Sequence, residues 1–205
     1  MLPKTLRQWA GIQPPTSLDP ASTALILIDF QGEYFNPAKL PIPGGPAAAR
    51  NAARLMDAAQ RLGLKVIHVQ HLAANPASPL FAPGSADADF VDPLRPRPGQ
   101  EVVVKHLPSS FVGTGLDALL RASEVQTLLI AGLMTHMCVD STARDAVSQG
   151  YKVIVAHDAC ASRDLPAFDG AIIPGDHVHR ATLAALADRF ADVMDTESLL
   201  GLMGR

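Results

Sequence analysis

The stretch that decides the fold is ALILIDF, residues 24–30, a short run of aliphatic side chains with almost no polar interruption. Such a run, without the alternation of a half-exposed strand, is typical of a strand buried on both faces of a parallel sheet. Five further runs are predicted to be strands: KVIHVQH (65–71), EVVVKH (101–106), TLLIAG (127–132), YKVIVAH (151–157) and ADVMDT (191–196).

Segments with helical spacing of apolar residues separate these strands. One runs from Ala52 to Leu62, and Gly63 follows it where the end of a helix favours glycine. Similar patterns predict three further helices, around 114–122, over 139–147 and over 177–190. Strands separated by helices indicate parallel pairing. We therefore predict an α/β fold, a three-layer α/β/α sandwich of one domain (1–205) with an extended N-terminal arm (1–23).

The composition excludes several classes of protein. Hydrophobic residues make up 48% of the 205 residues and charged residues 18%, against about 25% charged in an average soluble domain, which indicates a sizeable core. The 17 Lys and Arg residues do not cluster and the net charge is −3, so nucleic-acid binding is not expected. The sequence also shows no signal peptide, no run long enough to span a membrane and too few cysteines for a disulfide framework. We expect a cytoplasmic protein without membrane partners.

Three reactive side chains follow different predicted strands. Asp29 ends the first strand, Lys105 ends the third, and Cys138 lies six residues after the fourth, where a helix begins. The carboxyl ends of parallel strands meet at one edge of the sheet, where α/β proteins place their sites. Spacing alone does not show whether the three side chains reach one another.

These residue types suit nucleophilic catalysis. A thiol attacks as the thiolate, and a helix N-terminus or a nearby cation lowers its pKa from about 8.5. Asp29 would accept the proton of Cys138, a transfer that is uphill by about 6 kcal/mol for unperturbed groups. Burial of Asp29 and stabilisation of the thiolate by Lys105 would have to close that gap. Taken singly, the three could be a core thiol, a loop cap and a solvated charge; their combination favours a catalytic site.

Four segments carry a resemblance to a known family. GLMTHMCVDSTARDA (132–146) resembles the nucleophile segment of the isochorismatase-like cysteine hydrolases, in the isochorismatase/nicotinamidase superfamily. LILIDFQ (25–31) resembles the first strand of that family with its acidic residue, VVVKHLPSSF (102–111) its lysine segment, and HDACASRD (157–164) the exit of its fifth strand. The motifs occur in the family's order, and the resemblance extends over nearly the whole chain.

The resemblance implies a six-stranded parallel sheet of order 3-2-1-4-5-6, with Asp29, Lys105 and Cys138 as the catalytic triad. It also implies a cis peptide between Leu133 and Met134, and an oxyanion hole formed by the backbone N–H groups of Met134 and Cys138. The implied reaction is metal-independent hydrolysis of a C–N bond in a small amide, ureide or lactam, through a thioester-type acyl-enzyme.

Seven side chains are candidates for the substrate pocket, six because they lie near the triad in sequence and His71 because it is predicted at the pocket edge; each could instead belong to the core. They are Phe30, Tyr34, Phe35, His71, Phe111, His136 and Met137.

We expect neither a metal nor another cofactor. Nicotinamidases of this family carry an Asp-x-His metal motif, but the corresponding stretch here, 46–63, contains no histidine. His68 and His71 are three residues apart on a predicted strand and therefore point to opposite faces, one to the core and one to the pocket edge. GTGLDA (113–118) matches a dinucleotide fingerprint, but it follows a loop and no acid occurs at 133–138.

Two other functions remain open, and the sequence does not identify the substrate. Hydrolysis of an isochorismate-type vinyl ether needs Asp29 as an acid but no nucleophile, so Cys138 counts against it. A non-hydrolytic thiol sensor or ligand-binding module would show reversible oxidation of Cys138 and no turnover, and no resolving cysteine is evident unless Cys160 comes close.

We predict a homodimer or homotetramer. The segment PAFDGAIIPG (166–175) would otherwise expose Phe168, Ile172 and Ile173, and the Pro-rich arm suits packing on a partner subunit. Sedimentation velocity at micromolar concentration should give two or four times the mass of one chain, and a single monomeric species would contradict the prediction.

Activity should survive dialysis against EDTA, because the sequence offers no adequate set of metal ligands. Loss of turnover that one added divalent ion restores would instead point to a metal bound by His68, His71 or His136.

Overall fold

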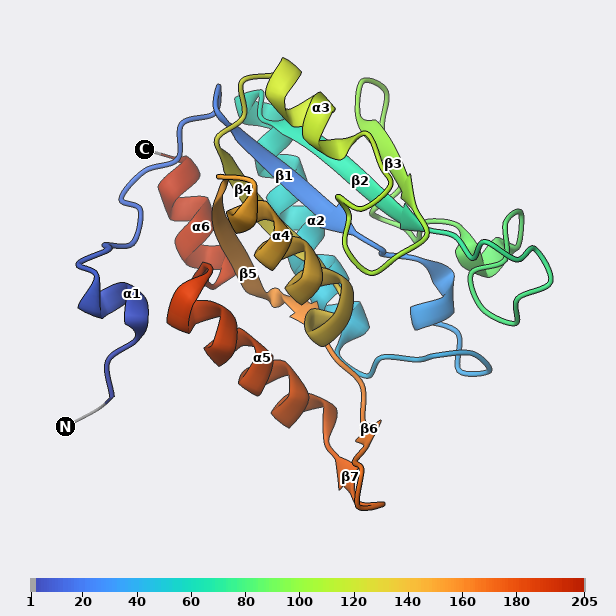
Figure 1. Ribbon diagram of the computed structural model, residues 1–205. Helices are drawn as coiled ribbons and strands as arrows, with labels where there is room; N and C mark the ends of the chain where they lie inside the picture. Colours follow the sequence, from blue (N-terminus) through green and yellow to red (C-terminus); the bar gives the residue numbers. More distant parts are fainter. Residues whose placement is uncertain (1–2, 205) are drawn as a thin grey trace.

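Six parallel strands form one sheet in the order β3-β2-β1-β4-β5-β8 in the computed structural model, which describes residues 3–204 (Figure 1). Their bounds are β1 Thr23–Ile28, β2 Lys65–His71, β3 Glu101–Lys105, β4 Thr127–Leu133, β5 Lys152–Ala161 and β8 Asp192–Met194. The predicted order 3-2-1-4-5-6 is confirmed. The sixth strand is numbered β8 because two short strands, β6 (Leu165–Pro166) and β7 (Ile172–Ile173), form a separate antiparallel hairpin before it.

Helices cover both faces of the sheet, so the predicted three-layer sandwich is also confirmed. On one face lie α2 (Gly45–Leu62) and α6 (Thr196–Met203), and on the other α3 (Leu116–Ala122), α4 (Asp140–Ser148) and α5 (Gly175–Arg189). Within residues 3–204, every helix is too short or too polar to cross a bilayer.

The strand β1 shows how the two cores are divided. All of its residues are buried. Leu25 and Leu27 pack in the core on the α2 and α6 side, whereas Ala24, Ile26 and Ile28 pack in the core on the α3, α4 and α5 side. This division follows from the alternation of side chains along a strand, and it explains why the sequence of β1 is apolar throughout.

The N-terminal arm is not wholly extended, contrary to the prediction. It contains a one-turn helix, α1 (Leu6–Trp9). The backbone N–H of Leu6 donates to Asp188 Oδ1 at 2.9 Å, and Arg7 Nη2 lies 2.6 Å from Asp192 Oδ2. The arm therefore packs against α5 and β8 of its own chain.

Two further features were not predicted. Helix α6 is short and begins two residues after β8, so its apolar residues could not be distinguished in the sequence from the end of that strand. Asp195 caps the helix by accepting a hydrogen bond from the backbone N–H of Ser198. The β6–β7 hairpin projects from the body of the fold (Figure 1), with Phe168 fully exposed at its tip and Ile172 largely exposed. The remaining short turns are the 3-10 turns η1 (Gly32–Tyr34) and η2 (Ala86–Ala88).

Gly132 marks a close approach between β4 and β1. A Cβ atom at this position would lie 2.6 Å from Ile28 Cβ and 2.7 Å from Ile28 O. The two residues are paired in the β1–β4 register, and the β4–β5 register shifts between Ile130 and Gly132. Because Asp29 follows Ile28 and Cys138 follows β4, this glycine fixes the spacing of the strands that carry both side chains.

We predict that Gly132→Ala lowers the free energy of unfolding by about 1–3 kcal/mol, the usual effect of overpacking. The midpoint of thermal unfolding, followed by circular dichroism, should fall by several degrees. The matched control is Gly201→Ala in α6, where an added Cβ meets nothing within 4 Å and alanine favours the helix. Equal midpoints for the two variants would contradict the prediction.

Candidate active site

Asp29, Lys105 and Cys138 lie together at the carboxyl edge of the sheet. Asp29 directly follows β1, Lys105 is the last residue of β3, and Cys138 lies in the π-helical turn η3 (Thr135–Val139) between β4 and α4. Lys105 Nζ is 2.8 Å from Asp29 Oδ2 and 3.3 Å from Cys138 Sγ. The structure therefore brings into contact the three side chains that the sequence singled out.

His71 gives the Lys105 ammonium a third neighbour. It ends β2, where the register pairs it with Lys105, and its Nδ1 lies 3.3 Å from Lys105 Nζ. An ammonium can only donate, so the ring nitrogen accepts and the imidazole is neutral. Burial, followed by the charge of Lys105, lowers the pKa of His71 to about 4. Lys105 thus has a carboxylate, a thiol and an imidazole as acceptors.

The side chains of Asp29 and Lys105 are both completely buried. Burial raises the pKa of Asp29, and the neighbouring Lys105 opposes that shift. Burial would lower the pKa of Lys105, but Asp29 and then Cys138 outweigh it and the pKa is raised. The charged pair is therefore maintained by mutual contact in a site that excludes water.

The thiol of Cys138 differs from the expectation. Burial, followed by the charge of Asp29, raises its pKa well above the ordinary value, and Lys105 only partly opposes this. Cys138 lies in η3, which continues directly into α4 at Asp140, so it stands at the start of a helical segment as the sequence predicts. The chain alone thus holds a neutral thiol beside a carboxylate that can accept its proton.

Gln31 is a supporting residue that the sequence analysis missed. Its Nε2 donates to the carbonyl oxygens of His71 at 2.9 Å and Ala88 at 2.7 Å, and its Oε1 accepts from the backbone N–H of His71 at 2.8 Å. This fully buried amide ties the chain after β1 to the end of β2. The sequence feature that could have indicated this role of Gln31 is its position as a polar residue directly after LILIDF.

Four of the seven predicted pocket residues lie beside the triad. His71 contacts Lys105, as described. Tyr34 is linked to the site through Phe81, whose ring centroid lies 5.3 Å from that of Tyr34 and 5.1 Å from that of His71, and burial followed by the charges of Cys138 and Asp29 raises the pKa of Tyr34. His136 and Met137 flank Cys138 in η3; Met137 is 40% exposed, and His136 Nδ1 lies 3.0 Å from Ser162 Oγ.

The other three pocket candidates pack in or against the two cores. Phe30 is fully buried, and the half-buried Phe35 packs against the same core and against the start of α2. Phe111 stacks on Tyr151 with ring centroids 5.9 Å apart, in the core under α3 and α4. Of the three, Phe111 lies in the same core cluster as Cys138.

Phe81 supplies an aromatic wall in their place. Its ring meets Tyr34 edge-on at 5.3 Å and His71 at 5.1 Å between centroids. Its backbone N–H donates to Glu33 Oε1 at 2.6 Å, and this contact holds the long loop between β2 and β3 against the site. The Pro-rich sequence of that loop gave no signal for this role.

Arg163 is a second residue that was missed, although it lies in the quoted HDACASRD segment. It is half-buried two residues after β5, and its Nη1 donates to the carbonyl oxygen of Asp164 at 2.9 Å. Within residues 3–204 no carboxylate lies within 4 Å of its guanidinium. Arg163 directly follows Ser162, whose Oγ lies 3.0 Å from His136 Nδ1 in η3, and its charge lowers the pKa values of His136 and Tyr34.

The histidines do not form a metal site in the part of the chain that the structure describes. His68 is buried, its Nε2 lies 2.8 Å from Gln100 Oε1, and its ring packs on Phe90. His71 faces Lys105, so the two histidines are separated as predicted. Residues 3–204 contain no group of three or more His, Cys, Asp or Glu side chains arranged for a metal ion.

The Leu133–Met134 peptide is cis, as the resemblance implies.

Comparison with known proteins agrees with this geometry. A family model described as the isochorismatase domain matches residues 23–198. YddQ of Bacillus subtilis, an uncharacterized isochorismatase family protein, is 39% identical over 179 residues, which cover 87% of this chain and 99% of YddQ. The ureidoacrylate amidohydrolase RutB of Methylobacterium radiotolerans is 35% identical, with 93% of this chain and 84% of RutB covered.

Solved structures give the same result. The crystal structure of an isochorismatase from Pseudomonas putida superposes with a TM-score of 0.87 at 34% sequence identity, and the match covers 97% of this chain and all of that one. The sheet order, the ordered sequence motifs and these relatives lead to one conclusion. This chain belongs to the isochorismatase family of hydrolases.

Proposed function

We propose that this hydrolase cleaves the C–N bond of a small amide or ureide, with Cys138 as nucleophile and without a metal. The observation that carries the proposal is the buried Lys105 ammonium, which contacts both Asp29 and Cys138. A 35% identical relative named as a ureidoacrylate amidohydrolase supports the bond type. The products are an acid and an amine or ammonia.

The first half of the reaction forms an acyl-enzyme. Cys138 gives its thiol proton to Asp29 as its sulfur attacks the carbonyl carbon of the substrate. The negative charge that develops on the carbonyl oxygen is held by the backbone N–H groups of Met134 and Cys138, the roles that the family resemblance implies. Asp29 then protonates the leaving nitrogen, and a thioester remains on Cys138.

The second half releases the acid. Asp29, again a carboxylate, accepts a proton from water as the water oxygen attacks the thioester carbon. The sulfur leaves and regains a proton, which restores the starting state. Lys105 stabilises negative charge on Asp29 and on Cys138 in turn, and the neutral His71 can accept a hydrogen bond from it without competing as a cation.

A ureide that also bears a carboxylate is the substrate class best suited to this site. Arg163 stands near Tyr34 and His136 without a carboxylate partner among the described residues, and guanidinium is well suited to binding a carboxylate. Tyr34 and Phe81 offer aromatic surface for a short, planar chain. This arrangement favours a small ureido acid over a large neutral amide.

The geometry disfavours the two alternative functions. A vinyl-ether hydrolase would use Asp29 as an acid but would leave Cys138 without a task at 3.3 Å from Lys105. A redox sensor needs an accessible thiol of low pKa, whereas Cys138 is buried with a raised pKa. Burial likewise raises the pKa of Cys160, to about 12.

We predict that Cys138→Ala lowers kcat/KM by about 10³-fold or more, because it removes the nucleophile. Asp29→Asn should be nearly as damaging, because no group then accepts the thiol proton. Lys105→Met should lower the rate and raise the pH at which iodoacetamide alkylates Cys138. Release of ammonia or amine from a panel of ureido acids, primary amides, carbamoyl amines and lactams is the measurement.

The matched control is Cys160→Ala, which removes the other buried cysteine and should leave turnover within a few-fold of the parent. Effects of the triad substitutions should not add in double variants, because the groups act as a unit. Substantial activity in Cys138→Ala with Asp29 still required would indicate acid-catalysed vinyl-ether cleavage. No turnover by the parent chain on any panel member, together with rapid oxidation of Cys138 by peroxide, would favour the sensor.

A further inference from the structure

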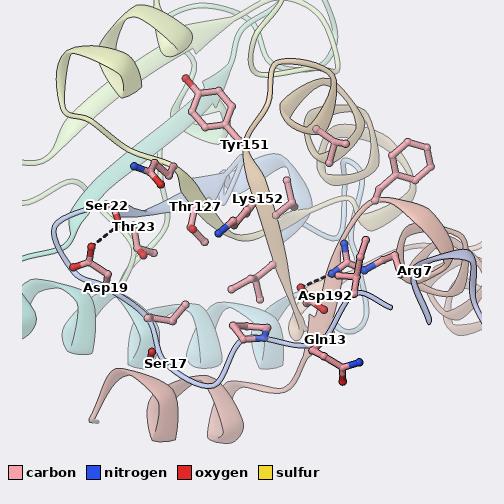
Figure 2. Close-up of a pocket in the computed structure, with 18 of the residues that line it drawn as sticks. Arg7, Gln13, Ser17, Asp19, Ser22, Thr23, Thr127, Tyr151, Lys152 and Asp192 are labelled. Carbon is pink, nitrogen blue, oxygen red and sulfur yellow. Dashed lines mark hydrogen bonds and ion pairs between the residues drawn. The ribbon is translucent and has the colours of Figure 1, made fainter. Parts of the chain in front are cut away.

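A cavity of about 530 Å³, whose lining is drawn in Figure 2, lies at the amino-terminal ends of the strands, whereas the triad lies at their carboxyl ends. It is bounded by the first residues of β1, β4, β5 and β8, by the last turns of α4 and α5, and by the N-terminal arm. Its volume falls in the usual range for small-molecule sites, about 300–1,000 Å³. The seven residues of β4 span about 20 Å, so the cavity is separate from the active site.

The arm forms one wall of this cavity and is fastened at its rim. Gln13 and Ser17 come from the arm, and Thr127 and Lys152 come from the starts of β4 and β5 (Figure 2). The ion pair between Arg7 and Asp192 closes the rim at 2.6 Å, with both side chains largely buried. The cavity is therefore built from segments distant in sequence and held together by a specific contact.

The carboxylates of the lining already have partners. Asp192 is paired with Arg7. Asp19 accepts from the hydroxyl of Ser22 at 2.7 Å and from the backbone N–H of Ala21 at 3.1 Å, and these bonds lower its pKa. Asp192 is thus neutralised by Arg7, whereas Asp19 keeps its charge, and Lys152 and Arg189 leave the lining with more cations than anions.

The helix ends that face the cavity are also capped. The backbone N–H groups of Gln149, Gly150 and Tyr151 bond back to carbonyl oxygens of the last turn of α4. The N–H groups of Phe190 and Ala191 both bond to the carbonyl oxygen of Leu186 in α5. The negative ends of these helices are thus partly neutralised.

Two of the cationic side chains that line the cavity, by contrast, have no ion-pair partner among the described residues. Lys152 and Arg189 are exposed, and within residues 3–204 neither has a carboxylate within 4 Å. Apolar side chains, including Ile12, Leu18 and Phe190, cover another part of the wall. The surplus of positive charge beside an apolar surface selects for a ligand that is anionic at one end and apolar at the other.

We propose that this cavity binds a small organic carboxylate with an apolar body, with Lys152 and Arg189 holding the carboxylate. The site does not depend on the proposed reaction. Because the arm forms one wall, a bound ligand joins the arm to the strands β4 and β5. The ligand should therefore order the N-terminal segment as well as occupy the cavity.

The test uses the full chain carrying Cys138→Ala, so that no probe is turned over, with benzoate as the probe. Titration followed by ¹H–¹⁵N NMR should show saturable shifts at the amides of Gln13, Thr127 and Lys152. Benzyl alcohol and benzylammonium, which match the ring without the negative charge, should bind at least about 5-fold more weakly. Lys152→Met and Arg189→Met should each raise the Kd for benzoate by a similar factor.

Two matched variants control for loss of charge alone. Lys65→Met changes a lysine that also begins a strand at this edge of the sheet, and Arg180→Met changes an exposed arginine on α5; neither lines the cavity, so the Kd should not change. Shifts confined to residues around the triad, equal binding of benzylammonium, or the absence of saturable binding would each overturn the proposal. Failure here leaves the triad experiment unaffected, because the two sites are at opposite edges of the sheet.

Discussion

The Lys105 ammonium has no exposed surface, and the carboxyl edge of the sheet is arranged around that constraint. An ion of this kind costs several kcal/mol to remove from water unless partners replace its hydration. Three strands or their continuations supply those partners: Asp29 after β1, His71 at the end of β2 and Cys138 after β4. The parallel registers of β1, β2, β3 and β4 must all hold for these acceptors to converge on one nitrogen. The arrangement of the site therefore depends directly on the pairing of these strands.

Much of this arrangement could be predicted from the sequence, because its signals are local. Uninterrupted aliphatic runs indicated the buried strands. Asp29 and Lys105 at the ends of two runs, and Cys138 a few residues after a third, indicated that the site lies at the carboxyl ends of the strands. The contact between His71 and Lys105 could not be predicted, because it depends on the register of β2 against β3. Phe81 was missed for a related reason: its place is set by the carboxylate of Glu33, which lies far from it in sequence.

Burial also changed the chemistry in a way that spacing could not reveal. A cysteine after a strand and before a helix is expected to have a lowered pKa, yet exclusion of water outweighs the nearby cation and the thiol remains neutral. The same burial raises the pKa of Asp29, which favours proton transfer to this carboxylate, whereas the raised pKa of the thiol opposes it.

The backbone of Asp29 has a φ of 54°, in the left-handed region that β1 itself does not enter. Asparagine and aspartate adopt this conformation readily, whereas other side chains with a Cβ meet a cost of about 1–2 kcal/mol there. An alanine scan of the site would consequently mix two effects at this position, a lost carboxylate and a strained turn. The apparent importance of Asp29 in such a scan would be inflated by conformational strain, and a library screened for retained folding would favour asparagine and glycine at position 29 whatever the reaction requires.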